Sequence, residues 1–236
     1  MPGQNPIPPP PDHPAASFTV GGIHAEAALA RIKELENEAL LVLPGNVTFK
    51  QLTADKEAIE AATALLRSTV GLNPSDEHGK DTPARFVQML RELTTPSDIK
   101  WKTFPNDGMD EMIVTEGIPF SSLCQHHVIP FIGVAHIGYV PDQLIAGLSK
   151  FARVVKYFAA SLQVQERLTM QIAEYLDREL KPRGVAVSLR AEHLCMTIRG
   201  AQVPGAKTTT TVTKGVFADH SRTAKAEFLS QINGRH

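Results

Sequence analysis

The sequence has few cysteines, no long apolar run and almost no net charge, and each shortage excludes a class of protein. No run of eighteen apolar residues occurs in the 236 residues, so a transmembrane helix is not expected. Lysine and arginine total 24 against 25 aspartate and glutamate, which gives a formal net charge of −1. No broad field therefore draws the chain to nucleic acid or to a membrane, and we expect neither partner. An anionic ligand would need a local cluster of basic groups.

The N-terminal residues lack the features of an export signal. Residues 1–22 are rich in proline and contain no basic stretch followed by an apolar one. We expect a disordered arm there, and a cytoplasmic protein whose two cysteines, Cys124 and Cys195, stay reduced. A disulfide between them is then less favoured than a metal site or a reactive thiol.

The spacing of apolar residues predicts helices first and a mixture of strands and helices later. Three helices are followed by the order β-β-α-α-β-β-α, which favours an α+β fold: an antiparallel four-stranded sheet with two helices on one face. Two helices cannot cover both faces, so we expect neighbouring subunits to close part of the sheet. The helices are expected over 23–43, 54–71, 81–93, two within 147–180, and 222–232, and the strands over 110–120, 131–141, 184–200 and 206–217.

This pattern divides the chain into three parts. We expect the arm over residues 1–22, an N-terminal helical region over 23–98 and a catalytic α+β domain over 99–236.

Two short segments place cysteine beside histidine. Cys124 and His127 are three residues apart in SLCQHHVIPF, and His193 and Cys195 are two apart in EHLCMTIRG. In a strand, both side chains of the second pair would point to one side. Zinc binds thiolate and imidazole, and catalytic zinc usually keeps three protein ligands. Spacing alone leaves three alternatives open: catalytic zinc, structural zinc with His126 or His193 as fourth ligand, or ordinary buried cysteines with core histidines.

Polar residues near two predicted helix starts suit a nucleotide. Ser149, Lys150 and Arg153 surround a helix start that could bind phosphate, although an ordinary N-cap would look the same. Gln165 and Glu166 open the next helix, and a carboxylate can accept hydrogen bonds from the N1–H and amine of guanine. The further basic candidates are Arg199 and Arg85.

Several segments in order resemble the GTP cyclohydrolase I family. They are SLCQHHVIPFIGVAHIGYVP, GLSKFARVVKYFAASLQVQERLTMQIAEYL, PRGVAVSLRAEHLCMTIRG and KTTTTVTKGVF, and the resemblance runs from about Asp81 to Leu229. It implies a tunnelling fold (T-fold) assembled as a toroidal homodecamer, with sites at subunit junctions. It also implies zinc held by Cys124, His127 and Cys195, and a reaction that opens the imidazole ring of GTP, releases formate and forms 7,8-dihydroneopterin triphosphate.

The resemblance implies roles for the other candidates. His193 would protonate the purine nitrogen, and His126 would assist opening of the ribose. Gln165 would position the base, and Glu166 would recognise the guanine edge. Ser149 would serve the sugar rearrangement and bind the triphosphate. The cations expected to hold the triphosphate are Lys150, Arg153, Arg199 and Arg85.

Two positions depart from the family pattern. Gln125 stands where the family commonly has glutamate, and Gln88 stands where it usually has lysine. The first change alters charge beside an expected ligand, and the second removes a cation from the expected phosphate site. Two alternatives therefore stay open: a diverged paralogue acting on another purine nucleotide, for example toward 7-deazapurines, or a non-catalytic purine- or pterin-binding assembly protein.

Overall fold

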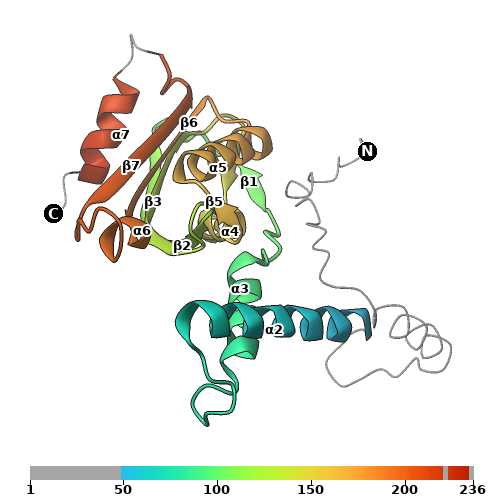
Figure 1. Ribbon diagram of the computed structural model, residues 1–236. Helices are drawn as coiled ribbons and strands as arrows, with labels where there is room; N and C mark the ends of the chain where they lie inside the picture. The colour runs from blue at the N-terminus through green and yellow to red at the C-terminus, as the bar shows by residue number, and fades with distance from the viewer. Residues whose placement is uncertain (1–48, 220–222, 234–236) are drawn as a thin grey trace. The chain divides into compact units, whose positions relative to one another are not determined.

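The computed structural model describes residues 49–219 and 223–233, with side chains from Asp55 onward (Figure 1). The predicted arm over 1–22 and the predicted helix over 23–43 lie outside the described residues. The chain divides into two units between Ala54 and Asp55, and the second, Asp55–His236, contains every expected site residue. The boundary expected between 98 and 99 stays a prediction.

Two helices open the described chain where the sequence predicts them. Helix α2 spans Phe49–Val70 and ends before Gly71, whose φ of 70° is a conformation that glycine adopts without strain. Helix α3 spans Thr82–Thr94 and begins after Asp81, with proline in its first turn. An ion pair between Arg91 and Asp55 joins the two helices.

An antiparallel sheet of four long strands forms the centre of the second unit, as predicted. A fifth strand of two residues pairs parallel with β2 at the edge, and a separate sheet of two short strands pairs β1 with β4. These three additional strands were not predicted because two or three residues carry no readable periodicity. The large sheet has the order β5-β2-β3-β6-β7, and the strands are β1 (Thr103–Pro105), β2 (Ile113–Cys124), β3 (Pro130–Val140), β4 (Leu144–Ala146), β5 (Leu162–Gln163), β6 (Gly184–His193) and β7 (Lys207–Gly215).

Helices cover the sheet on both faces. Helices α4 (Ser149–Ala159) and α5 (Gln165–Leu180) pack on one face, where alternate residues of β6 such as Val187 join the main core. Helix α7 (Ala224–Asn233) packs on the opposite face (Figure 1). Ala186 of β6 and Phe228 of α7 belong to the smaller core cluster there. Gly138 lies under this helix, and a Cβ there would stand 2.7 Å from the Phe228 ring. The two helices on one face are thus confirmed, and α7 adds a partial second layer.

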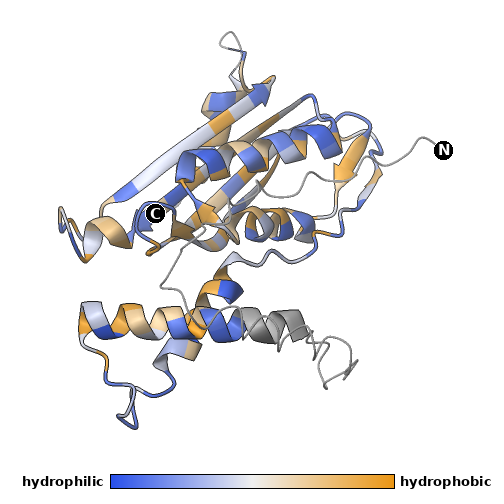
Figure 2. Cartoon of the chain, turned by 45° about the vertical axis from the view of Figure 1, so that its right-hand side comes forward, coloured by the Kyte–Doolittle hydropathy of each residue, from blue (hydrophilic) through white to orange (hydrophobic). Residues whose placement is uncertain are grey.

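The sheet ends on one side at β7, a strand dominated by threonine. Figure 2 shows it as a long pale strand of intermediate hydropathy. Among the described residues β7 pairs only with β6, so its other edge offers free backbone groups. Within the described ranges, no helix combines the length and apolar composition that a membrane span requires.

The strand predicted over 184–200 is too long. Strand β6 ends at His193, and Leu194–Thr197 form the short helix α6 instead. Pairing with β3 stops at His193 and pairing with β7 stops at Glu192, so no neighbour extends the strand. The backbone groups after His193 then form hydrogen bonds within the helical turn: the Ile198 N–H donates to the Leu194 carbonyl at 3.0 Å. Cys195 therefore lies on a helical turn, and not on the strand face shared with His193.

Candidate metal centre

The first cysteine and its histidines lie on a tight turn at the end of β2. The Cys124 N–H donates to the Ile129 carbonyl at 2.9 Å, and the Val128 N–H donates to the Cys124 carbonyl at 2.8 Å. Val128 has a φ of 55°, which is unfavourable for a β-branched residue. The turn closes on itself in this way, and residues 125–127 on it are exposed. Such backbone strain is common at functional sites.

Cys124, His127 and Cys195 come together although 71 positions separate the two cysteines. Their ligand atoms all lie within 4.8 Å of one another. Cys124 is buried, Cys195 is half-buried and His127 is exposed, so the cluster opens to solvent on the histidine side. Burial raises the pKa of the Cys195 thiol, and the neighbouring Cys124 raises it further. Two thiolates this close repel each other unless a cation lies between them.

Two further histidines flank this cluster without belonging to it. Nδ1 of His126 lies 3.7 Å from Sγ of Cys124. His193 ends β6 directly opposite Phe131 of β3, and the two rings stack with centroids 4.7 Å apart and planes 2° apart. Burial lowers the pKa of the His193 imidazole, and the carboxylate of Glu166 opposes that shift.

Gln165, the first residue of α5, is almost fully buried at 1% exposure. Its Oε1 lies 2.8 Å from Nε2 of His193. Its Nε2 lies within 3.1 Å of three acceptors: the Leu189 and Thr208 carbonyls and Oγ1 of Thr210. The amide is therefore engaged at both ends by the protein itself. Glu166, the next residue, is exposed at the start of α5.

The residues expected to bind phosphate on α4 lie at its N-terminal end. Ser149 and Arg153 are exposed, and Lys150 is half-buried. The C-terminal end of the same helix adjoins the strand that carries Cys124, because Oγ of Ser122 donates to the Ala159 carbonyl at 2.7 Å. Eleven residues at about 1.5 Å each give a helix roughly 16 Å long. Within one chain, the two groups thus stand at opposite ends of α4.

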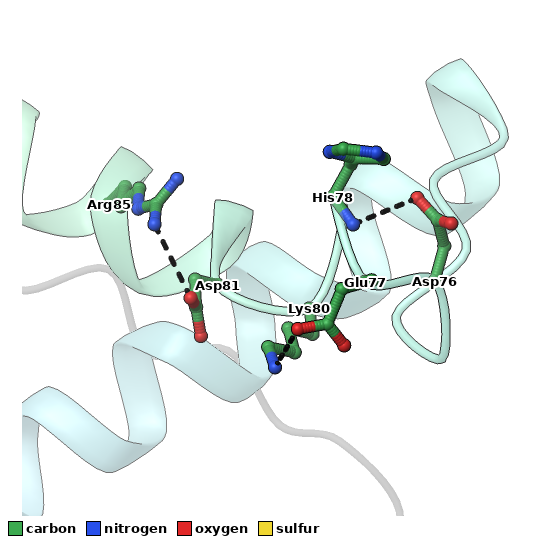
Figure 3. A network of polar contacts seen from close by, with 6 residues as sticks. All are labelled: Asp76, Glu77, His78, Lys80, Asp81 and Arg85. Carbon is green, nitrogen blue, oxygen red and sulfur yellow. Dashed lines mark hydrogen bonds and ion pairs between the residues drawn. The ribbon is translucent and has the colours of Figure 1, made fainter.

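The remaining basic candidates are also exposed. Arg85 on α3 pairs with Asp81 at 3.4 Å, within a set of local contacts that includes Lys80 with Glu77 (Figure 3). Arg199 follows α6, and its positive charge opposes the rise in the pKa of Cys195. Among the described residues, neither arginine hydrogen-bonds to another expected site residue.

The hydrogen bonds of Arg167 beside the cluster could not be predicted from the sequence. Arg167 of α5 donates from Nη2 to Oε1 of Gln125 at 2.7 Å and to the Leu162 carbonyl at 2.6 Å. It also donates from Nε to Oε1 of the buried Gln163 at 2.9 Å. The residue that follows Cys124 is thereby tied to α5. The motif QERL gives no hint of this, because the partners come from elsewhere in the chain.

Comparison with known proteins matches most of this chain to one protein family. A family profile described as GTP cyclohydrolase I matches residues 59–233, which include every expected site residue. The GTP cyclohydrolase 1 of Aquifex aeolicus (strain VF5) is 44% identical over 184 residues, covering 78% of this chain and all of the relative. That of Mycolicibacterium vanbaalenii (strain PYR-1) is 46% identical over 184 residues, covering 75% of this chain and 91% of the relative. A crystal structure of the archaeosine synthase QueF-Like in the apo form covers 47% of this chain and 97% of that chain, with 14% identity and a TM-score of 0.37.

Proposed function

Because this chain belongs to the GTP cyclohydrolase I family, we propose that it opens the imidazole ring of GTP, releases formate and forms 7,8-dihydroneopterin triphosphate. The observation that carries the proposal is the Cys124–His127–Cys195 cluster, within which three donor atoms lie 4.8 Å or less apart. A purine ring opening needs an activated water and proton donors, and His126 and His193 flank this cluster.

The donor set fits zinc. Two thiolates and one imidazole are ligands that zinc prefers, and three protein ligands leave a fourth position open. The proximity of the two sulfurs fits as well, since a divalent cation would offset the repulsion between their thiolates. Neither His126 nor His193 is among the three donors of the cluster, which favours a catalytic over a structural metal. When bound, zinc would supply Lewis-acid activation of water near neutral pH.

The other side chains would bind the base and move protons. His193 would deliver a proton to the purine nitrogen as the ring opens, and His126 would serve the ribose oxygen. Glu166, exposed one residue beyond the buried Gln165, would accept hydrogen bonds from the guanine edge. A positioned acid or base of this kind contributes about 10²–10⁴-fold in rate.

A complete site would need more than one chain. Helix α4 is roughly 16 Å long, and its C-terminal end adjoins β2, the strand that ends at Cys124. The expected phosphate-binding residues lie at its other end: Ser149, Lys150 and Arg153. The triphosphate of a GTP bound at the cluster would then be held by these residues of a neighbouring copy, together with Arg199 and Arg85. The free edge of β7 offers the backbone groups for such an assembly. We expect a ring-shaped homodecamer in the cytoplasm, and sedimentation velocity gives its mass directly.

The decisive experiment incubates the zinc-loaded protein with GTP and follows pterin absorbance and formate. Cys195→Ser and His193→Ala should each abolish turnover. Full activity in either variant would remove the role proposed for that residue. Turnover of another purine nucleotide with none of GTP would favour a diverged paralogue, which the neutral Gln125 and Gln88 make worth testing.

A further inference from the structure

We infer that Gln165 is a positioning residue that fixes His193 in the tautomer carrying hydrogen on Nε2, which leaves Nδ1 as the ring nitrogen available for proton exchange with the reactants. The inference deepens the function proposed above, because it assigns the proton of a histidine in the same site. It also changes the role expected for Gln165, which would act on the base only through His193.

The orientation of the Gln165 amide follows from its surroundings. The atom near Leu189 and Thr208 meets two backbone carbonyl oxygens, which can only accept hydrogen bonds. An amide oxygen in that position would face two carbonyl oxygens at 3.0 and 3.1 Å that cannot donate, and the Thr210 hydroxyl at 3.1 Å could satisfy it only in part. The NH₂ group must therefore lie there, and Oε1 must be the atom 2.8 Å from His193.

The tautomer of His193 follows from the amide. Since Oε1 of Gln165 can only accept, the contact at 2.8 Å requires a hydrogen on Nε2 of His193. The neutral ring then carries its lone pair on Nδ1. Proton delivery would move the Nδ1 hydrogen of the imidazolium to the purine nitrogen and leave the neutral ring with Nε2–H in place. The hydrogen bond to Gln165 survives this transfer unchanged.

Further contacts make the support rigid. The Phe131 ring lies flat against the imidazole and is itself completely buried. Oγ1 of Thr169 lies 2.6 Å from Oγ1 of Thr210, which accepts from Gln165 in turn. The ring plane is thus set by Phe131 and its rotation by Gln165. Because Gln165 is buried and its amide is engaged at both ends, it cannot reach a base without breaking this arrangement.

Two variants separate positioning from simple structural support. Gln165→Met keeps the length of the side chain but removes the acceptor for His193. Thr210→Val is the matched control: it removes one hydrogen bond from the same amide and leaves the Oε1 contact intact. A structural role alone predicts that both lower thermal stability and neither changes the histidine ring.

The test is magic-angle-spinning NMR of the zinc-loaded assembly with ¹⁵N- and ¹³C-labelled histidine at pH 8. A difference spectrum against His193→Asn identifies His193 among the nine histidines. We expect Nε2–H with a bare Nδ1 in the parent and in Thr210→Val, and a mixture of tautomers in Gln165→Met. If GTP is the substrate, Gln165→Met should lower kcat by about 100-fold, the lower end of what a positioned acid contributes, and change KM by less than about threefold.

The inference is overturned if the parent shows hydrogen on Nδ1, or if Gln165→Met leaves either the tautomer or kcat as in the parent. The parent spectrum decides the tautomer even if Gln165→Met fails to fold. Since that spectrum requires no turnover, it stands apart from the proposed reaction: absence of GTP hydrolysis would refute the function and leave the tautomer assignment to be judged by NMR alone.

Discussion

Replacing Arg167 with methionine tests whether the turn that carries Cys124 and His127, the proposed metal ligands, is held by α5. Methionine keeps much of the apolar stem and removes all three hydrogen bonds of the guanidinium. Gln163 is 2% exposed, so its Oε1 would be left as a buried acceptor without this donor, at a cost of about 1–3 kcal/mol. The contact with Gln125 is exposed and adds at most about 1 kcal/mol. We expect a total loss of roughly 3 kcal/mol.

The substitution should also lower the affinity of the protein for zinc. Residues that support metal ligands typically change affinity by about 10–100-fold when removed. Arg167 acts one residue away from a ligand, through Gln125, so we expect the lower end, about tenfold. Competition with a chromophoric zinc chelator measures affinity, and urea unfolding of loaded and metal-free protein measures stability. Protein concentration is held constant, because the stability of an oligomer depends on it.

Arg178→Met provides the matched control. Arg178 lies on the same helix and over the Tyr175 ring, and among the described residues its ion pair is with its neighbour Glu179 at 2.9 Å. Its replacement should cost about 1 kcal/mol or less and leave zinc affinity unchanged. If Arg167→Met proves no more destabilising than Arg178→Met and binds zinc equally well, the turn is not held by α5 and the reasoning fails.

Three further substitutions test other parts of the structure. Val128→Asn should stabilise the protein by about 1 kcal/mol, because asparagine tolerates the positive φ that valine adopts there; a lower melting temperature would contradict this. Gly138→Ala should cost about 1–3 kcal/mol, because its Cβ would meet the Phe228 ring at 2.7 Å; a melting temperature equal to that of the parent would show that α7 shifts freely. Cys195→Ser should lower the zinc content well below one per chain by elemental analysis, and a full complement would remove this residue from the ligand set.

The sequence predicts the long elements and the metal donors, but not how the donors are supported. Helices α4 and α5 follow from apolar periodicity, because each buries one face, and the four long strands follow from β-branched, partly alternating runs. The chemistry of cysteine and histidine indicates a shared metal site for Cys124 and Cys195, and the structure brings the two side chains together. The end of β6 was placed too late, because a strand stops where its partners stop, and pairing partners cannot be read from the strand itself.

The surroundings of His193 show the same limit. The burial of Gln165 depends on carbonyl groups of Leu189 and Thr208, which any residue could offer at those positions. The stacking on Phe131 depends on the register between β3 and β6. Neither the strand register nor the positions of the backbone carbonyls can be read from the residue types. The sequence can therefore identify which side chains carry the chemistry and leaves open what fixes their orientation.

The separation of the two residue groups along α4 has a genetic consequence. A chain with Cys195 replaced keeps the α4 residues proposed to bind phosphate, and a chain with Lys150 replaced keeps the Cys124–His127–Cys195 cluster. If each reaction centre draws on two copies, mixed rings of the two defective chains would contain some junctions with no defect at all. Co-expression of the two inactive chains would then restore part of the turnover. Co-expression of either inactive chain with the wild-type chain would inactivate some of the subunit junctions in each ring.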